Sequence, residues 1–392
     1  MRIINKNKSP RRSGERFDIV SIANSKCMSI TTLVDRKRVF VAMSGGVDSS
    51  VAAALLKKRG FDVVGVFFKP WQPNLRSDLF WDSKSDLVNQ SHCDWEQDRR
   101  DAMIVASVLE IPFKTWDFSK EYKNKVGNYM IETYRQGLTP NPDVMCNKEI
   151  KFGLFLKKAL AEGADYVATG HYIRKVEGKN PKLLKGKDKN KDQSYFLWTL
   201  TQEQLKRCLF PIGDYIKPEV RKLAKKFKLP THNKKDSQGV CFIGQLDMKQ
   251  FLKSYIKPKK GDIRLISTKE VIGKHEGAAY YTIGQRHGLN ITDGYGPYFV
   301  VSKDIRKNII YVGEEKDLYS DKAKIYKINW INGKPKLPVK IEVKIRYRTK
   351  TEKAVLYKNR KLRFKNPIRA VTLGQSAVFY KGEEMLGGGV IV

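Results

Sequence analysis

The segment TPNPDVMCNKEI (139–150) carries a cysteine in a setting that favours a reactive thiol. Two prolines stiffen the chain before Cys146, and Asn147 has the type of side chain that caps a helix. We therefore expect Cys146 at or just before a helix N-terminus and beside Lys148, two features that stabilise the nucleophilic thiolate. Asp143 lies on the same loop, where its carboxyl group can serve as a general acid or base. The alternative is a cysteine that only packs against the core.

A second cysteine, Cys241, lies in the segment KDSQGVCFIG (235–244). Glycines on both sides make this loop flexible, and Lys234 and Lys235 make its start basic. A basic, flexible loop with one thiol suits a sulfur carrier that has to move between two positions. A buried structural cysteine would fit the segment equally well, so the assignment depends on what accompanies the thiol.

The two thiols are accompanied by the run SGGVDSS (44–50), between a strand expected over 39–43 and a helix expected over 51–58. The glycine pair permits a tight turn, and the first N–H groups and the dipole of the helix then favour an anion such as phosphate. The run is not a Walker A loop, because no Gly-Lys-Ser/Thr follows. It resembles the loop of the PP-loop ATP pyrophosphatases, which split ATP between its α and β phosphates to adenylate a substrate. The alternative is an ordinary strand-to-helix turn with a serine cap.

The charge balance points to a polyanionic partner. The chain has 76 Lys or Arg against 41 Asp or Glu, a net charge of +35, which favours nucleic acid, although lysine-rich genome bias or solubility would also explain it. No apolar stretch approaches the length of a membrane span. The five cysteines form no CxxC pair, which argues against a zinc site and a secreted disulfide framework and indicates a reducing compartment.

The pattern along the chain predicts an α/β fold followed by β-rich domains. Residues 38–215 alternate between strands expected over 39–43, 62–68, 113–117 and 166–169 and helices over 51–58, 95–109, 120–136 and 148–161, with a further helix over 218–228. This alternation predicts a doubly wound parallel sheet of Rossmann-like type, with ligands at the carboxyl ends of its strands. A long loop is expected over 70–93.

From about residue 260 short β-rich runs alternate with Gly, Asn and Lys turns, which predicts small barrels. The expected strands are 280–283, 297–302, 309–312, 323–328, 341–346, 362–364 and 376–379. We expect a basic N-terminal arm over 1–37, a PP-loop adenylating and thiolating catalytic domain over 38–245, a central β-rich domain over 246–314 and a C-terminal, tRNA-binding β-barrel over 315–392. The protein is expected in the cytoplasm, or in the mitochondrion if the arm is a transit peptide.

Eight motifs in family order make the chain resemble the tRNA-specific 2-thiouridylases, which convert the wobble uridine (position 34) of certain tRNAs to 2-thiouridine. Besides the three segments above they are ATGHY (168–172), KDQSYFL (191–197), TIGQRHGL (282–289), RYR (346–348) and GQSAVFYKGEEMLGGG (374–389). The resemblance covers about residues 38–392. Phe68 stands where many relatives have methionine.

The resemblance implies a role for each matching residue. ATP, with Mg²⁺ as its only metal, would adenylate O2 of the uridine, and Cys241 would carry sulfur as a persulfide received from a sulfur-donor protein. Cys146 would be the second thiol, with a transient Cys146–Cys241 disulfide as the product, and Asp143 would transfer protons. The ATP-binding residues would be Ala42, Met43, Ser44, Gly45, Gly46, Val47, Asp48, Ser49, Phe68 and Gly170. The tRNA or target-base contacts would be Asn141, Pro142, Asp143, His171, Lys191, Asp192, Gln193, Arg346, Tyr347 and Gln375.

Two other classes of protein share some of these features. Another PP-loop adenylating enzyme, such as an amidotransferase-type synthetase, would need neither two reactive cysteines nor so large a positive charge. A cluster-dependent tRNA thiolase would be expected to carry CxxC pairs, although a cluster held by Cys146, Cys241 and another ligand stays open. A non-catalytic RNA-binding protein would share the basic barrels but would not need Asp48 and both thiols together.

Overall fold

The structure is a computed structural model that describes residues 36–73, 95–236, 247–291 and 294–392. Cys27, Cys93 and Cys241 lie outside the described residues, as do almost all of the expected basic arm and most of the expected 70–93 loop. Predictions that concern those segments therefore have no structural counterpart below.

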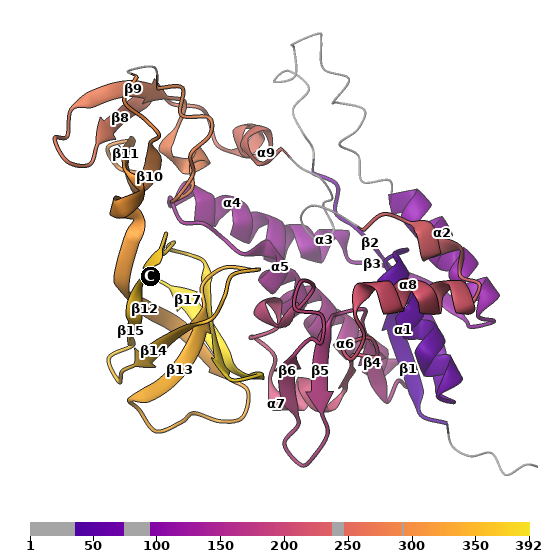
Figure 1. Cartoon of the computed structure of the whole chain (residues 1–392). Coiled ribbons are helices and arrows are strands. Elements are labelled where there is room, and N and C mark those ends of the chain that lie inside the picture. The colour runs from indigo at the N-terminus through magenta and orange to yellow at the C-terminus, as the bar shows by residue number, and fades with distance from the viewer. Residues whose placement is uncertain (1–35, 74–94, 237–246, 292–293) are drawn as a thin grey trace, which may run out of the picture. The chain divides into compact units, whose positions relative to one another are not determined.

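A parallel five-stranded sheet forms the N-terminal part of the described chain (Figure 1). Its order is β3-β2-β1-β4-β7, and every neighbouring pair is parallel. The strands are β1 (Arg38–Ala42), β2 (Asp62–Lys69), β3 (Phe113–Asp117), β4 (Tyr166–Ala168) and β7 (Cys208–Leu209). β1 and β2 are almost continuously apolar because helices cover both faces of the sheet.

Alternate residues of β1 and β2 belong to two different apolar clusters, one on each face. Val39 and Val41 pack with helices α1 (Val47–Lys58), α2 (Trp95–Val108) and α8 (Lys217–Lys226). Phe40 packs with the segments of the other face, which are α3 (Ser119–Tyr122), η3 (Lys123–Gly127), α4 (Asn128–Arg135), α5 (Pro142–Met145), η4 (Cys146–Phe155) and α6 (Leu156–Ala161). The predicted doubly wound α/β fold is confirmed.

The central β-rich part is a separate four-stranded sheet with the order β10-β11-β8-β9. Its strands are β8 (Gly261–Leu265), β9 (Val271–His275), β10 (Phe299–Asp304) and β11 (Ile309–Gly313). Helix α9 (Met248–Tyr255) precedes it, and η7 (Ala278–Tyr280) and η8 (Glu315–Leu318) are short 3₁₀ turns. The prediction of a strand over 280–283 is wrong. Tyr280 ends a 3₁₀ turn, and its run is apolar because Tyr280 and Tyr281 are both buried in a connection.

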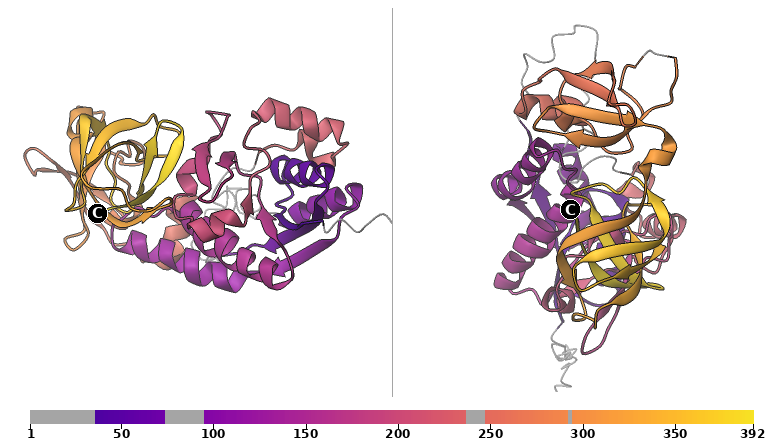
Figure 2. Two further views of the ribbon diagram at one scale, coloured as in Figure 1. Left: turned by 90° about the horizontal axis from the view of Figure 1, so that it is seen from below. Right: turned by 90° about the vertical axis from the view of Figure 1, so that its left-hand side faces the viewer.

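The C-terminal part is a closed β-barrel, as predicted (Figure 2). Its strands follow the order β12-β15-β14-β13-β16-β17, and β12 also pairs with β17, which closes the ring. They are β12 (Tyr319–Trp330), β13 (Val339–Lys344), β14 (Glu352–Leu356), β15 (Lys361–Arg369), β16 (Ser376–Lys381) and β17 (Glu384–Ile391). Closure leaves the barrel without free strand edges.

A hairpin of the N-terminal part extends the barrel sheet. It consists of β5 (Ile173–Val176) and β6 (Lys182–Lys185), and β6 pairs with β17. The remaining elements of this part are η5 (Ser194–Phe196), α7 (Gln202–Lys206) and η6 (Pro230–Asn233). The sequence pattern did not predict the hairpin, because its partner strand lies about two hundred residues away in the chain.

A buried polar network fastens the segment around η5 to the barrel. The Asp192 carboxylate accepts hydrogen bonds from the backbone N–H groups of Gly186 and Ser194 and forms an ion pair with Lys344 at 3.0 Å. The hydroxyls of Ser194 and Tyr380 lie 2.9 Å apart. The network is satisfied on both sides, so it specifies one arrangement of the two segments.

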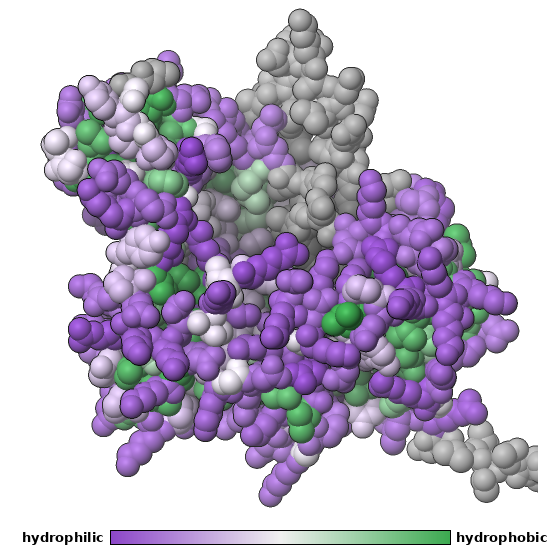
Figure 3. All heavy atoms as spheres, in the orientation of Figure 1, coloured by the Kyte–Doolittle hydropathy of each residue, from purple (hydrophilic) through white to green (hydrophobic). Residues whose placement is uncertain are grey.

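Among the described residues, no helix combines the length and the apolar character that crossing a membrane requires. On the face drawn in Figure 3 hydrophilic residues predominate, and apolar residues occur in small groups. The surface therefore gives no sign of a large apolar contact on this face.

We predict that Asp192→Ala lowers the free energy of unfolding by about 3 kcal/mol, because it leaves the largely buried Lys344 ammonium without its partner. Urea unfolding followed by fluorescence measures the change. The control is Glu132→Ala, which removes an ion pair to Arg135 exposed on both sides and should change stability by less than ~1 kcal/mol. Equal effects of the two substitutions would contradict the structural role of Asp192.

Candidate active site

The turn between β1 and α1 forms the predicted anion site at the carboxyl end of a parallel strand. Gly45 has a φ of 73°, in the left-handed region, and a Cβ there would lie 2.2 Å from the Asp98 carbonyl oxygen. Helix α1 begins at Val47 and not at residue 51 as predicted, with Gly46 as its N-cap. Its first N–H groups therefore belong to the glycine run itself, where they lack helical acceptors and favour an anion.

Two serine side chains hold this turn in shape. The Ser49 hydroxyl accepts a hydrogen bond from the Ser44 N–H at 3.1 Å, and the Ser50 hydroxyl donates to the Gly46 carbonyl at 2.8 Å. Ser44 is exposed while Ser49 and Ser50 are buried. The loop is thus preorganised by its own residues, which lowers the entropic cost of binding a ligand.

Gly170 supports the turn from the end of the neighbouring strand β4. A Cβ on Gly170 would lie 2.7 Å from the Ser49 backbone nitrogen and 2.8 Å from the Asp48 carbonyl carbon. Only glycine permits this approach, so the predicted ATP-binding residue Gly170 lies against the first turn of α1.

Asp48 places a carboxylate in the first turn of α1, where it would repel the phosphates that the helix N-terminus attracts. Lys217, at the start of α8, removes this difficulty because its ammonium group lies 2.8 Å from both Asp48 carboxylate oxygens. The Tyr172 hydroxyl donates a further hydrogen bond to Asp48 at 2.7 Å. A lysine that is distant in the chain thus brings positive charge to a loop that lacks the Walker lysine.

Lys217 also contacts Asp236, the last described residue before the Cys241 segment. Its ammonium group lies 2.8 Å from the Asp236 carboxylate, which also forms ion pairs with Lys191 at 2.5 Å and Arg221 at 2.9 Å. Burial alone would raise the pKa of Asp236, but Lys191 and Lys217 outweigh it and lower the pKa to about 2. One lysine therefore joins the phosphate loop to the base of the segment that carries the second thiol. Cys241 itself lies outside the described residues.

Cys146 lies one turn inside a helical segment rather than at its beginning. The helix starts at Pro142 with Asn141 as N-cap, whose side chain accepts a hydrogen bond from the Val144 N–H at 3.3 Å. The predicted cap, Asn147, is instead a buried residue within η4 that donates to the Phe196 carbonyl. Proline at N1 after an asparagine is a recognisable helix start, so this signal was present in the sequence. Cys146 is fully buried.

The loop before Cys146 is completed by residues of the barrel. Gln375 donates hydrogen bonds from its side-chain nitrogen to the carbonyl oxygens of Thr139, at 3.3 Å, and Pro140, at 2.8 Å. The Tyr195 hydroxyl donates to the Ser376 carbonyl at 3.1 Å and is also hydrogen-bonded to the Asn141 side chain. The structure thus brings Gln375 against the loop that contains Asn141 and Pro142, although Gln375 lies more than two hundred residues further along the chain.

An aromatic group adjoins this loop. The rings of Phe196 and Tyr347 lie 4.6 Å apart, and the Arg348 guanidinium lies 5.2 Å from the Tyr347 ring. Arg346 donates to the Ile283 carbonyl at 3.0 Å and to the Thr372 hydroxyl at 3.1 Å, so it links the barrel to the central part. Aromatic and guanidinium faces of this kind can stack on an unpaired base.

Several predicted ligand contacts are largely buried in the structure. His171 is hydrogen-bonded to the Thr169 hydroxyl at 2.7 Å, and burial holds the pKa of its ring well below the usual range, so the ring is neutral at pH 7. Phe68 packs against Phe118 and Phe155 in the core. Gln193 accepts a hydrogen bond from the Tyr172 N–H at 3.0 Å. These side chains organise the site, and their contact with a ligand stays a prediction.

Among the described residues, no group of three or more His, Cys, Asp or Glu side chains could hold a metal ion. Mg²⁺ needs no such group when it arrives with a nucleotide, since it keeps several waters and binds one or two carboxylates together with phosphate oxygens. Both carboxylate oxygens of Asp48 already contact Lys217, so the residues present fit an ion that phosphate oxygens and water hold.

A parallel sheet with a glycine turn and a helix N-terminus at the end of β1 defines a nucleotide-binding α/β protein of the PP-loop class. Family models match three consecutive parts of the chain. The tRNA methyl transferase HUP domain matches residues 37–245, the tRNA methyl transferase PRC-barrel domain 249–314 and the aminomethyltransferase beta-barrel domain 320–391. Together with the relatives below, they show that the chain belongs to the tRNA-specific 2-thiouridylase family.

Curated relatives named tRNA-specific 2-thiouridylase MnmA match nearly the whole chain. The protein from Geobacillus kaustophilus, named MnmA 2, is 46% identical over 364 residues, and that from Listeria monocytogenes is 46% identical over 365. The Bacillus licheniformis protein is 46% identical over 374 residues. Each match covers 90% of this chain and 94% of the relative.

Solved structures match less of the chain. NMN synthetase from Francisella tularensis is 16% identical with a TM-score of 0.33, over 54% of this chain and 68% of that one. A 4-thiouridine synthetase solved with RNA and bound ATP is 19% identical with a TM-score of 0.30, over 53% of this chain and 46% of that one.

We predict that Gly170→Ala weakens ATP binding by up to ~100-fold, because the new methyl group would displace the backbone of the phosphate loop. Isothermal titration calorimetry with ATP measures the effect. The control is Gly273→Ala in β9, where the nearest atom to a new Cβ is 3.4 Å away. Unchanged ATP affinity of a folded Gly170→Ala variant would contradict the placement of the nucleotide.

We predict that Asp236→Asn lowers the free energy of unfolding by about 1–2 kcal/mol at pH 7. The folded pKa of Asp236 is lowered from 3.8 to about 2, so its contribution is complete above pH 4 and is lost as the pH falls towards 2. Urea unfolding at pH 7, 4 and 3 should therefore show a difference between variant and wild type that shrinks with acidity. A difference that grows as the pH falls would contradict the ion-pair network.

Proposed function

We propose that this protein is a tRNA-uridine 2-sulfurtransferase that replaces O2 of the wobble uridine, position 34, by sulfur with the consumption of ATP. The observation that carries the proposal is the tie from the phosphate loop through Lys217 to Asp236, which joins the ATP site to the base of the Cys241 segment. The family membership and the names of the relatives support the same activity.

The first step we propose is adenylation of the uridine. Its O2 attacks the α-phosphorus of ATP, the bond to the bridging oxygen breaks, and pyrophosphate leaves. The N–H groups at the start of α1 hold the phosphates, and Lys217 keeps the Asp48 carboxylate from repelling them. Mg²⁺ carried by the nucleotide would be held by phosphate oxygens and water and would neutralise part of the phosphate charge.

The second step we propose is sulfur transfer, which requires two thiols. Cys241 carries a persulfide, and the thiolate of Cys146 attacks its inner sulfur to form the Cys146–Cys241 disulfide and release hydrosulfide. Hydrosulfide adds to C2 of the adenylated uridine, AMP leaves, and Asp143 takes up the proton. The two electrons that reduce the sulfane sulfur come from the thiols, so a dithiol reductant must restore them after each turnover. The reducing cytoplasm would supply one.

The target base is proposed to bind between the 139–143 loop and the barrel. Asn141 and Pro142 would contact the flipped-out base, and Tyr347 with Arg346 would stack on or bond to neighbouring nucleotides. Support comes from the hydrogen bonds that join this loop to Gln375 and Tyr195. Because Cys146 is buried in the structure, the reaction requires that tRNA binding make its thiol accessible.

Two further parts of the proposal rest on chemistry alone. The persulfide sulfur must be delivered by a sulfur-donor protein, because nothing in adenylation produces a sulfane sulfur. Methyl transfer, which the names of two matching family models mention, would need neither thiol loop nor ATP-phosphate site. The glycine turn and the two cysteine segments therefore favour sulfur transfer.

We predict that Cys241→Ser and Cys146→Ser each lower 2-thiouridine formation by at least ~10³-fold, while tRNA-dependent release of pyrophosphate from ATP continues. Mass spectrometry of digested tRNA measures the product, ATP labelled in the γ-phosphate reports pyrophosphate, and ATP labelled in the α-phosphate reports AMP release by the wild type. The matched control is Cys208→Ala, since burial raises the pKa of the Cys208 thiol to about 12 and leaves it inert. Sulfur transfer by the Cys241→Ser variant, or ADP as the nucleotide product, would overturn the proposal.

A further inference from the structure

The outer face of strands β12 and β15 presents like charges directly opposite one another. The strand register pairs Lys322 with Arg363 and Lys324 with Lys361, and all four side chains are exposed. Residues 319–330 and 357–369 together carry nine Lys or Arg and one acid, Asp321. Asp321 lies 3.9 Å from Arg363, a long ion pair that leaves the three lysines uncompensated by it.

Like charges that face each other across two strands lower the stability of a sheet. The neighbouring hairpin of the same barrel avoids this arrangement, because its register places Glu342 opposite Lys353. The Lys322–Arg363 and Lys324–Lys361 pairs therefore lower the stability of the barrel, whereas the Glu342–Lys353 pair raises it. An arrangement of this kind is expected where a surface binds an anion.

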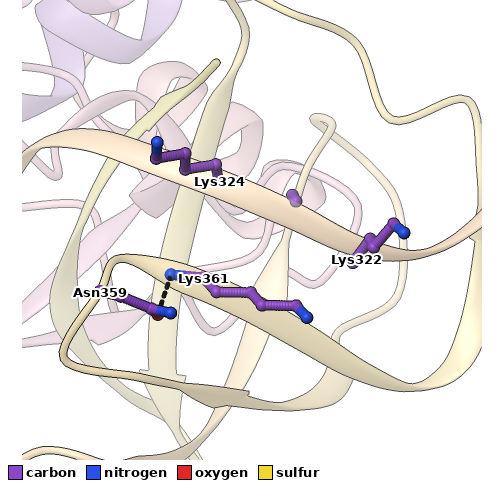
Figure 4. Close-up of a pocket in the computed structure, with 5 residues that line it drawn as sticks. Lys322, Lys324, Asn359 and Lys361 are labelled. Atoms are coloured by element: carbon purple, nitrogen blue, oxygen red, sulfur yellow. Dashed lines mark hydrogen bonds between the residues drawn. The ribbon is translucent and has the colours of Figure 1, made fainter.

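A shallow hollow of about 470 Å³ lies on this face, lined by Lys322, Ala323, Lys324, Asn359 and Lys361 (Figure 4). The Asn359 side chain accepts a hydrogen bond from the Lys361 N–H at 3.1 Å, which holds the turn that forms one side of it. Within the described part of the chain, no carboxylate forms an ion pair with any of the three lysines. The ammonium groups that line the hollow are therefore available to bind phosphate.

This face is connected to the candidate active site through the last strand of the barrel. The Val392 N–H donates to the Lys324 carbonyl at 2.9 Å, and the Ile391 N–H donates to the Gln375 carbonyl at 2.9 Å. Gln375 in turn holds Pro140, beside the proposed base-binding residues. Because neighbouring strands are about 5 Å apart, Lys324 lies within about 10 Å of Gln375 along the sheet.

We propose that Lys322, Lys324 and Lys361 bind the sugar–phosphate backbone of the tRNA whose wobble base occupies the active site. This inference rests on the proposed function and extends it to a surface that reads no base. Phosphate contacts of this type position a nucleic acid without sequence preference, and each one releases counterions on binding. The opposing like charges, destabilising in the free protein, are neutralised when the backbone lies across both strands.

The test is the triple variant Lys322→Gln, Lys324→Gln and Lys361→Gln in the full chain. Filter binding of full-length tRNA at several salt concentrations should show a Kd about tenfold higher near physiological salt. The slope of log Kd against log salt should fall by about 2–3, close to one unit for each lost phosphate contact. The melting temperature should stay the same or rise, because the like-charge repulsion is removed.

The matched control is Lys222→Gln, Lys225→Gln and Lys226→Gln on α8, three exposed lysines whose loss changes the net charge equally. The inference would be overturned if the barrel variant bound tRNA with the same affinity and salt slope as wild type. It would also be overturned if the α8 control variant lost as much tRNA affinity as the barrel variant. Thiolation by the wild type, measured in parallel, tests the proposed function separately. If wild type thiolates and the barrel variant binds tRNA normally, only the inference fails.

Discussion

The contact on which the site depends is the ammonium group of Lys217 between the carboxylates of Asp48 and Asp236. A helix N-terminus attracts phosphate only if the acid in its first turn is neutralised, and Lys217 supplies that neutralisation from another helix. The same group fixes the residue from which the Cys241 segment departs. Removal of this one cation would leave the Asp48 carboxylate without its ion pair in a part-buried position and would break the link to Asp236, so the two sites are connected electrostatically.

The barrel contributes to the site through hydrogen bonds rather than through reactive groups. Gln375 satisfies two carbonyl oxygens of the loop that precedes α5, and Tyr195 joins Asn141 to the backbone of β16. Asp192 and Lys344 form a buried ion pair between the segment around η5 and the barrel. The barrel thus holds the 139–143 loop, the proposed base-binding loop, in one conformation, so a part of the chain without reactive groups can still position the site.

Local sequence patterns were sufficient for β1 to β4 and the glycine turn, because apolar runs and glycine pairs act within a few residues, but they missed the two-residue strand β7. They were insufficient wherever a long-range contact decides the outcome. Lys217 lies just before the helix expected over 218–228 and has no local signal, because its partners are Asp48, 169 residues away, and Asp236. The hairpin β5–β6 is too short to be recognised without β17. The run at 280–283 is apolar because its tyrosines are buried in a connection, and short apolar runs do not distinguish that case from a strand.

The excess of positive charge also becomes meaningful only through the partners of individual lysines. Lys217 and Lys344 form ion pairs with internal carboxylates, so they contribute little to the electrostatic field outside the protein. Lys322, Lys324 and Lys361 face other cations across two strands, so their charge is directed outward and weakens the fold that carries it. A lysine retained for solubility can be placed anywhere on a surface, and opposite an acid it would also stabilise the sheet. The like-charge pairs across β12 and β15 therefore argue for a bound polyanion. The net charge of +35 alone does not, because lysines kept for solubility would also produce it.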